Sequence, residues 1–266
     1  MTTPVALTIA GSDSSGGAGI QADLKTFAAL GVYGASALTA LTAQNTRGVS
    51  GVHLVPPEFV TAQIDAVFDD LDVVAVKIGM VAQTPIIEAI AASLSRWKPA
   101  HVVLDPVMVA TSGDRLLPED AVAALQRLLI PRASLITPNL PEAAALLGEA
   151  VAADAAAIEA QGLRLLALGC PAVLIKGGHG QGPESSDYLV TAQGSLKLTA
   201  PRMTAKNTHG TGCSLSSAVA AGLAKGEDLE TAVRNAKAFI SNAIAAADRF
   251  TVGHGHGPVH HLHRFY

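Results

Sequence analysis

The order of apolar runs and helical patterns is the feature that most limits the fold of this chain. Short runs typical of buried strands alternate with segments of helical periodicity along the sequence. The predicted strands cover residues 5–10, 33–41, 73–78, 101–104, 134–137 and 172–175. The predicted helices cover residues 20–30, 58–68, 84–97, 118–129, 141–147, 155–168, 214–223 and 229–247. This alternation predicts an α/β fold with a central, mostly parallel sheet and helices on both faces.

One domain is expected over residues 1–266. No linker rich in Gly, Ser or Pro interrupts the pattern, and the apolar share of 49% is ample for one core. Residues 186–198 contain two short strands with turn residues between them, which predicts an antiparallel hairpin or flap.

Polar and glycine residues follow several of the predicted strands. In open α/β sheets, ligands bind beyond the carboxyl ends of the strands. The residues that gather there are Gly11, Asp13, Gln44, Lys77, Asp105, Asn139 and Lys176.

The segment Gly210–Ser214 leads into the helix predicted at 214–223. A glycine-containing helix entry directs unpaired backbone N–H groups at a ligand, and the helix dipole favours an anion there. We expect a phosphate, and we expect the dipole to lower the pKa of the Cys213 thiol below its usual value of about 8.5. The alternatives are an ordinary helix start capped by Ser or Thr, and a small buried cysteine.

The run 207–213, Asn-Thr-His-Gly-Thr-Gly-Cys, resembles the anion-hole signature of the ribokinase-like kinases. Cys213 stands where most sugar kinases of that superfamily have Asp, and this is typical of its vitamin kinases. The whole set is similar to the hydroxymethylpyrimidine and phosphomethylpyrimidine kinases of thiamine biosynthesis. The further matching segments are 10–23, 44–46, 77–80, 137–142 and Lys176–His179.

The resemblance implies a ribokinase-like fold and an ATP-dependent kinase that uses Mg²⁺. Its acceptors would be 4-amino-5-hydroxymethyl-2-methylpyrimidine and then the monophosphate, which becomes the diphosphate. The backbone of Gly210, Thr211, Gly212 and Cys213 would hold the transferring group, and Cys213 would take the alcohol proton. The resemblance places Gln44, Gly11, Asp23, Met80 and Val107 at the pyrimidine, and Asn139, Lys176, Thr208 and His209 at the nucleotide. Glu142 and Asp105 would serve the metal ion, although an acid at 142 also suits the first turn of a helix.

Other functions are less compatible with the sequence. The run 17–22 matches the G-x-G-x-x-A dinucleotide fingerprint, but residues 36–43 lack the acidic partner that a nicotinamide site requires, and no Walker A loop occurs. A net charge of −4 without a basic run argues against nucleic-acid binding. No apolar run is long enough for a membrane span, and residues 1–5 do not resemble a leader. With two cysteines far apart, we expect a cytoplasmic protein.

Two alternatives to this kinase remain open. A pyridoxal or pyridoxine kinase of the same fold would share most of these motifs, and a non-catalytic ligand-binding module would show no turnover. The histidines at 254, 256, 260, 261 and 263 fit no standard zinc spacing. Relatives are usually dimers, so a homodimer is expected.

Overall fold

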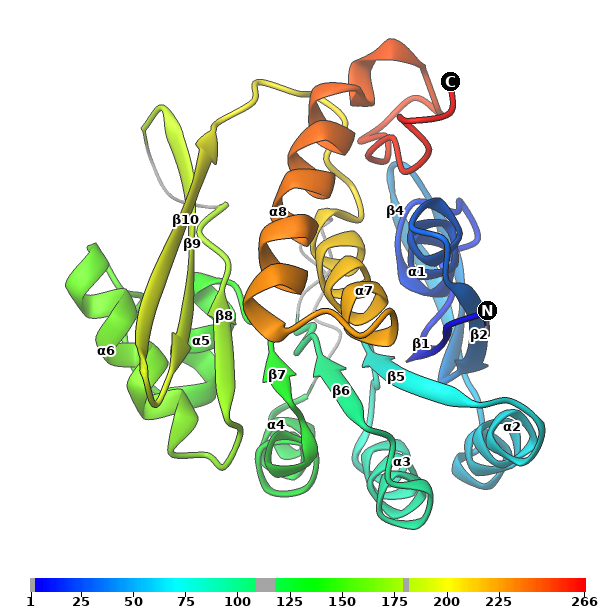
Figure 1. Ribbon diagram of the computed structural model, residues 1–266. Helices are drawn as coiled ribbons and strands as arrows, with labels where there is room; N and C mark the ends of the chain where they lie inside the picture. Colours follow the sequence, from blue (N-terminus) through cyan, green and yellow to red (C-terminus); the bar gives the residue numbers. More distant parts are fainter. Residues whose placement is uncertain (1–2, 109–117, 179–181) are drawn as a thin grey trace.

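The computed structural model describes residues 3–108, 118–178 and 182–266. Its main sheet has eight strands in the order β10-β9-β8-β7-β6-β5-β1-β2 (Figure 1). The strands of this sheet are β1 Val5–Ala10, β2 Tyr33–Leu38, β5 Val73–Ile78, β6 His101–Leu104, β7 Leu135–Ile136, β8 Ala172–Ile175, β9 Glu184–Thr191 and β10 Gly194–Pro201. The pairs from β2 to β8 are parallel, and β9 and β10 complete one edge as antiparallel strands. The predicted mostly parallel sheet is therefore confirmed.

Helices cover both faces of this sheet. One layer contains α2 Pro57–Asp70, α3 Thr84–Trp97, α4 Glu119–Leu128, α5 Leu140–Leu147 and α6 Ala155–Leu166. The other contains α1 Gly19–Ala29, α7 Thr211–Ala224 and α8 Leu229–Ala245. Two 3₁₀ turns occupy Ile130–Arg132 and Ala247–Arg249. Within the described ranges, no helix combines the length and apolar character that crossing a membrane would require.

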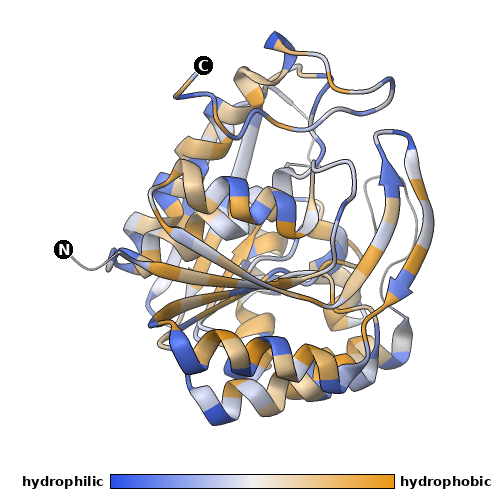
Figure 2. Cartoon of the chain, turned by 90° about the vertical axis from the view of Figure 1, so that its right-hand side faces the viewer, coloured by the Kyte–Doolittle hydropathy of each residue, from blue (hydrophilic) through white to orange (hydrophobic). Residues whose placement is uncertain are grey.

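Side-chain alternation along the strands explains the two layers. In β1, Leu7 and Ile9 pack into the core beneath α2 and α3, whereas Ala6 faces the core shared by α1, α7 and α8. Successive strand residues point to opposite faces, so a strand buried on both faces is apolar throughout. Figure 2 shows these hydrophobic strands between the helical layers.

One predicted strand was wrong, because the segment 33–41 forms parts of two strands. The chain turns at Thr39, whose hydroxyl donates to the Met80 carbonyl at 2.6 Å. It continues as β3 Ala40–Asn45, which pairs with β4 Gly48–Leu54 in a separate two-stranded sheet. The strand β4 escaped prediction because most of its residues are exposed and it therefore lacks a buried apolar run. The hairpin predicted at 186–198 is present as β9 and β10.

The start of α7 differs from the prediction in a way that matters for the site. The helix begins at Thr211, three residues before the predicted start at Ser214. Gly212 and Cys213 therefore belong to its first turn and not to a loop.

Candidate active site

A cavity of about 1310 Å³ lies at the carboxyl ends of the parallel strands and against the first turn of α7. Ligand sites in open α/β sheets occupy this position. Its wall includes every residue named above for catalysis, the nucleotide and the metal, and four of the five named for the pyrimidine. Asp23 is the exception. The volume exceeds the range of about 300–1,000 Å³ usual for one small ligand, so it suits two.

The first turn of α7 presents backbone N–H groups to this cavity. Gly210 precedes the helix at φ +80°, and a Cβ there would lie 1.9 Å from the Gly17 carbonyl oxygen, so only glycine fits. The N-cap position is Gly210, which has no side chain to cap the helix, so this is not the ordinary Ser or Thr start. In the described parts of the chain, the amides of Gly212 and Cys213 have no acceptor. The Thr211 amide differs, because it donates to the Thr208 carbonyl at 3.3 Å.

The Cys213 side chain lines the cavity and is partly exposed. Burial raises the pKa of its thiol to about 11, against an opposing effect of the Lys77 ammonium. The predicted lowering of this pKa is therefore wrong. The dipole argument considered only the helix, whereas the folded chain removes water from the thiol and brings the carboxylates of Asp23 and Asp105 near it.

Asp23 does not line the cavity. Its side chain is fully buried and forms an ion pair with the equally buried Lys77, at 2.8 Å between Oδ2 and Nζ. It also accepts hydrogen bonds from the hydroxyls of Thr8 at 2.6 Å and Ser217 at 2.7 Å. The Asp23 carboxylate is therefore bound to buried partners inside the protein. The resemblance predicted a pyrimidine contact for Asp23, and the structure corrects this prediction. Despite burial, the partner Asp23 raises the pKa of Lys77, so this ammonium stays charged.

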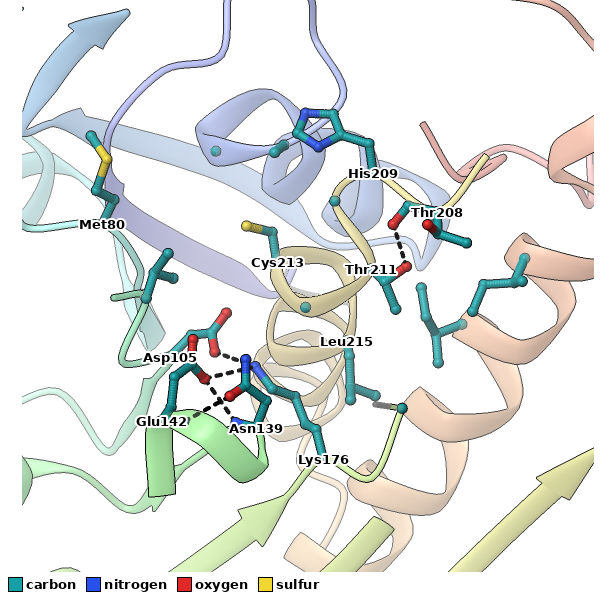
Figure 3. A pocket seen from close by; sticks show the side chains of 18 of the residues that line it. Met80, Asp105, Asn139, Glu142, Lys176, Thr208, His209, Thr211, Cys213 and Leu215 are labelled. Carbon is teal, nitrogen blue, oxygen red and sulfur yellow. Dashed lines mark hydrogen bonds and ion pairs between the residues drawn. The ribbon is translucent and has the colours of Figure 1, made fainter. Parts of the chain in front are cut away.

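Four polar side chains form one cluster at the end of the cavity below Cys213 (Figure 3). Lys176 Nζ lies 2.6 Å from Asp105 Oδ1 and 3.8 Å from Glu142 Oε2. Asn139 and Glu142 cap α5 reciprocally, each side chain accepting from the backbone N–H of the other at 2.8 and 2.7 Å. Glu142 is thus a capping acid and also part of the cavity wall, which unites the two interpretations of this residue.

The charges in this cluster are strongly coupled. Burial raises the pKa of Glu142 to about 6, while Lys176 opposes this and Asp105 adds to it. Burial would also raise the pKa of Asp105, but the ammonium groups of Lys176 and Lys77 outweigh it, and the pKa of Asp105 is lowered. The two carboxylates in turn overcome desolvation at Lys176 and raise its pKa.

The cluster is compatible with Mg²⁺. This ion needs only one or two carboxylates when substrate phosphates and water complete its shell. Asp105 and Glu142 supply two on the cavity wall, and one Lys leaves the set negative. Among the described residues, no group of three or more His, Cys, Asp or Glu could hold a metal by itself.

Four of the predicted pyrimidine residues lie on the wall of the same cavity. Gly11, Met80 and Val107 line it, and a Cβ at Gly11 would meet the Met80 side chain at 2.3 Å. Gln44 projects from β3, with its Nε2 3.5 Å from Nε2 of His209. His209 was assigned to the nucleotide, but it lies beside Gln44 and its Nε2 is 2.8 Å from Asp13 Oδ2.

Asp13 organises the loop before α1, a role that its motif alone did not reveal. Its carboxylate accepts from the backbone N–H groups of Ser15, Gly17 and Ala18 at 2.9, 3.1 and 2.8 Å. These bonds and His209 outweigh the effect of burial and lower the pKa of Asp13. An acidic residue followed by a glycine-rich turn is the signal that could have indicated this role.

Several cavity residues were missed by sequence reasoning. The missed apolar members of the wall include Ala200, Pro201, Met203, Leu215, Ile240 and Ile244, and the missed polar members include Ser185, Asp187, Arg202, Lys237 and Ser241. Ile240 and Ile244 lie one turn apart in α8 and resemble any buried helical stripe, so sequence cannot separate them from the core. Two predictions involve residues outside the described part of the chain. They concern His179 in the motif at 176–179, and residues 1–2 in the comparison with a leader.

Comparison with known proteins gives a consistent family. The family model described as phosphomethylpyrimidine kinase matches residues 13–260. The chain is 58% identical to the hydroxymethylpyrimidine/phosphomethylpyrimidine kinase of Rhizobium meliloti over 99% of each chain. It is 56% identical to that of Escherichia coli over 98% of each.

Solved structures show the same relationship. The phosphomethylpyrimidine kinase of Clostridium difficile shares 44% identity at a TM-score of 0.80, over 90% of this chain and 99% of that one. The pyridoxal kinase of Bacillus subtilis, solved as an ADP complex, shares 37% at 0.92 over the full length of both. By the family model and by identity over its whole length, the chain belongs to the phosphomethylpyrimidine kinase family.

Proposed function

We propose that this protein is an ATP-dependent kinase of thiamine biosynthesis that acts twice on one pyrimidine. It phosphorylates the hydroxymethyl group of 4-amino-5-hydroxymethyl-2-methylpyrimidine and then converts the monophosphate to the diphosphate. The observation that carries this proposal is one cavity in which the Gln44 end and the Lys176 end meet at the N–H groups of α7. The names of the relatives at 58% and 56% identity support the same substrate.

Positioning and charge neutralisation account for most of the catalysis expected here. The phosphoryl group passes through a loose transition state with charge on its equatorial oxygens. The amides of Gly212 and Cys213 and the positive end of α7 would stabilise that charge, with Gly210 and Thr211 shaping the turn. Because these donors are fixed by the helix, they need no reorganisation during transfer.

The acceptor would lie between Gln44 and Cys213. The Gln44 carboxamide offers a donor and an acceptor for the paired edge of an aminopyrimidine, and Met80 and Val107 provide apolar contacts for the ring. The acceptor hydroxyl must lose its proton in the first transfer. Cys213 would receive that proton late in the reaction in its thiolate form, which Lys77 favours. This form is the minor one at neutral pH, because burial raises the pKa of the thiol to about 11, so the first transfer should speed up as the pH rises.

The nucleotide would occupy the Lys176 end. The ammonium of Lys176 would neutralise phosphate charge, and Asn139 and Thr208 would contact the phosphates. Asp105 and Glu142 would hold Mg²⁺, which supplies further neutralisation of phosphate charge when bound. The apolar wall formed by Leu215, Ile240 and their neighbours would accommodate the nucleoside.

The pyridoxal alternative has weaker support, because the pyridoxal kinases share 37% and 32% identity with this chain. The test is to incubate the protein with Mg-ATP and either the pyrimidine alcohol or pyridoxal, and to follow the products by mass. We expect a pyrimidine monophosphate followed by the diphosphate, at a higher kcat/KM than with pyridoxal. A pyridoxal phosphate product without pyrimidine phosphorylation would contradict the proposal.

We also infer that residues 1–266 act as a single domain and that two copies form a cytoplasmic homodimer. The unpaired thiols of Cys170 and Cys213 suit a reducing compartment. A group of exposed apolar side chains on β2, the β3–β4 hairpin and α2 supports association of two copies. Its members are Tyr33, Leu41, Val52, Leu54 and Phe59. Light scattering should give twice the chain mass of 27.0 kDa, and Val52→Glu should weaken the dimer. A monomeric wild-type protein at micromolar concentration would contradict this inference.

A further inference from the structure

The C-terminal segment 253–259 is bound to the turn that follows β3. The Gly255 N–H donates to Thr46 Oγ1 at 3.0 Å, and the His256 N–H donates to the Thr46 carbonyl at 2.8 Å. Thr46 lies two residues beyond Gln44, at the tip of the β3–β4 hairpin. The segment therefore holds the hairpin that carries the proposed pyrimidine contact.

The same segment is bound to the strand-like run that enters α7. The Gly257 N–H donates to Asn207 Oδ1 at 3.0 Å. The His209 N–H donates to the Gly257 carbonyl at 3.0 Å, and the Val259 N–H donates to the His209 carbonyl at 3.2 Å. Residue 209 is followed directly by Gly210 and the first turn of α7, so these bonds fix the approach to the phosphoryl-transfer amides.

The segment makes these contacts through its own backbone and not through its side chains. A Cβ at Gly255 would lie 2.1 Å from the Thr46 carbonyl oxygen, and one at Gly257 would lie 2.4 Å from Asn207 Oδ1. The intervening side chains of His254 and His256 are exposed. The glycines of the histidine-rich tail are thus explained by close docking, whereas these two imidazoles take no part in it.

The residues that directly follow the segment, His260 and His261, anchor it to the body of the protein. The Nε2 atom of the buried His261 lies 2.9 Å from the hydroxyl oxygen of Ser214, which is in the first turn of α7. The His260 N–H donates to the Ala243 carbonyl in α8 at 3.1 Å, and the His260 ring packs edge-on against Phe250 at 4.7 Å. Figure 1 shows this segment in red above α1 and β4. A displacement of the segment should therefore shift both the β3–β4 hairpin and the start of α7, because a packed backbone does not deform continuously.

We propose that residues 253–259 are a strut that sets the distance between the pyrimidine-reading hairpin and the amides of α7. Gly255, Gly257 and Thr46 are then positioning residues, which act through Gln44 and the first turn of α7 and touch no substrate. This inference rests on the proposed function for its kinetic consequence. Catalysis by orientation is sensitive to displacements of about 1 Å, so loosening the strut should slow transfer.

The test compares Gly255→Ala with the matched variants His254→Ala and His256→Ala. For Gly255→Ala we expect the pyrimidine KM to rise and kcat to fall, each on the order of tenfold, with the KM for ATP within about twofold of wild type. Hydrogen exchange should accelerate together in residues 40–54 and 206–213. The two histidine variants should match wild type in every measurement.

A gentler variant covers the case in which Gly255→Ala does not fold. Thr46→Val deletes only the hydroxyl that accepts from the Gly255 N–H, and it should change the same quantities by a smaller factor. Unchanged kinetics and exchange in both variants would overturn the strut. So would a KM for ATP that rises as much as the pyrimidine KM, because that indicates general loosening.

The exchange measurement separates this inference from the proposed function. If the wild-type protein does not phosphorylate the pyrimidine, the proposed function fails. Coupled acceleration of the two segments in Gly255→Ala would still support the strut, and independent behaviour of the two segments would exclude it.

Discussion

Removing the carboxylate of Asp23 should damage stability far more than substrate affinity. In Asp23→Ala, the Lys77 ammonium stays fully buried without its ion-pair partner. Breaking a buried pair by deleting one partner costs about 3–5 kcal/mol. The hydroxyls of Thr8 and Ser217 also lose their acceptor, at about 1 kcal/mol each. We therefore expect a loss of about 5–7 kcal/mol in the free energy of unfolding.

Denaturant unfolding measures this loss as a lower midpoint at unchanged slope. In a thermal scan, the midpoint should fall by roughly 10–28 °C, at about 2–4 °C for each kcal/mol. The control is the double variant Asp23→Leu with Lys77→Met, which replaces both charges with apolar groups. It should lie within about 2 kcal/mol of wild type or exceed it.

Kinetics of the double variant then separate the two roles of the pair. The first transfer should be slow, because the positive charge of Lys77 near Cys213 is gone. The reasoning is refuted if Asp23→Ala stays within about 1 kcal/mol of wild type in stability while its pyrimidine KM rises. That result would return Asp23 to the substrate pocket.

Three further predictions concern the cavity itself. Cys213→Ala should slow the first transfer by about 10²–10⁴-fold, because a base is lost. The second transfer should be slowed much less, because its acceptor is already charged. Equal losses in separate single-turnover assays of the two steps would exclude Cys213 as the base. Gln44→Ala should raise the KM for the aminopyrimidine by roughly tenfold or more and leave the KM for ATP unchanged, and steady-state kinetics with an unchanged pyrimidine KM would remove Gln44 from the pocket. Since the pKa of Glu142 is about 6, its carboxylate is lost as the pH falls through 6, so the apparent affinity for Mg²⁺ should fall there. Glu142→Gln should have low Mg²⁺ affinity at all pH values without this inflection, and a wild-type titration that is flat from pH 5 to 7.5 would contradict the role.

Elements whose signals are local could be predicted from sequence. The helix at Thr84–Trp97 and the strand at Val73–Ile78 have the predicted bounds. Each is bounded by local start and stop residues, and each buries an apolar pattern of its own. The division of 33–41 at Thr39 could not be seen, because it depends on a hydrogen bond to Met80, which is distant in sequence.

The candidate site also combines features that could be predicted from local sequence with features that could not. The motif around Gly210 and Cys213 predicted an anion site, and these residues line the cavity at the start of α7; the bound anion stays a prediction. The pKa of Cys213 could not be predicted, because its burial and its neighbours Lys77 and Asp105 come from other elements. The Lys77–Asp23 pair was also hidden, because two charges 54 positions apart give no local sign that they meet.

The contact between Gly17 and Gly210 bears on how the protein is made. The loop at Gly17 follows β1, whereas Gly210 and the segment 253–259 are synthesised much later. Nascent chains that end before residue 206 lack one wall of the cavity, however well their sheet has formed. Phosphorylation is therefore expected only after the segment 206–259 has left the ribosome, and long-range closure of this kind is slow compared with local helix formation.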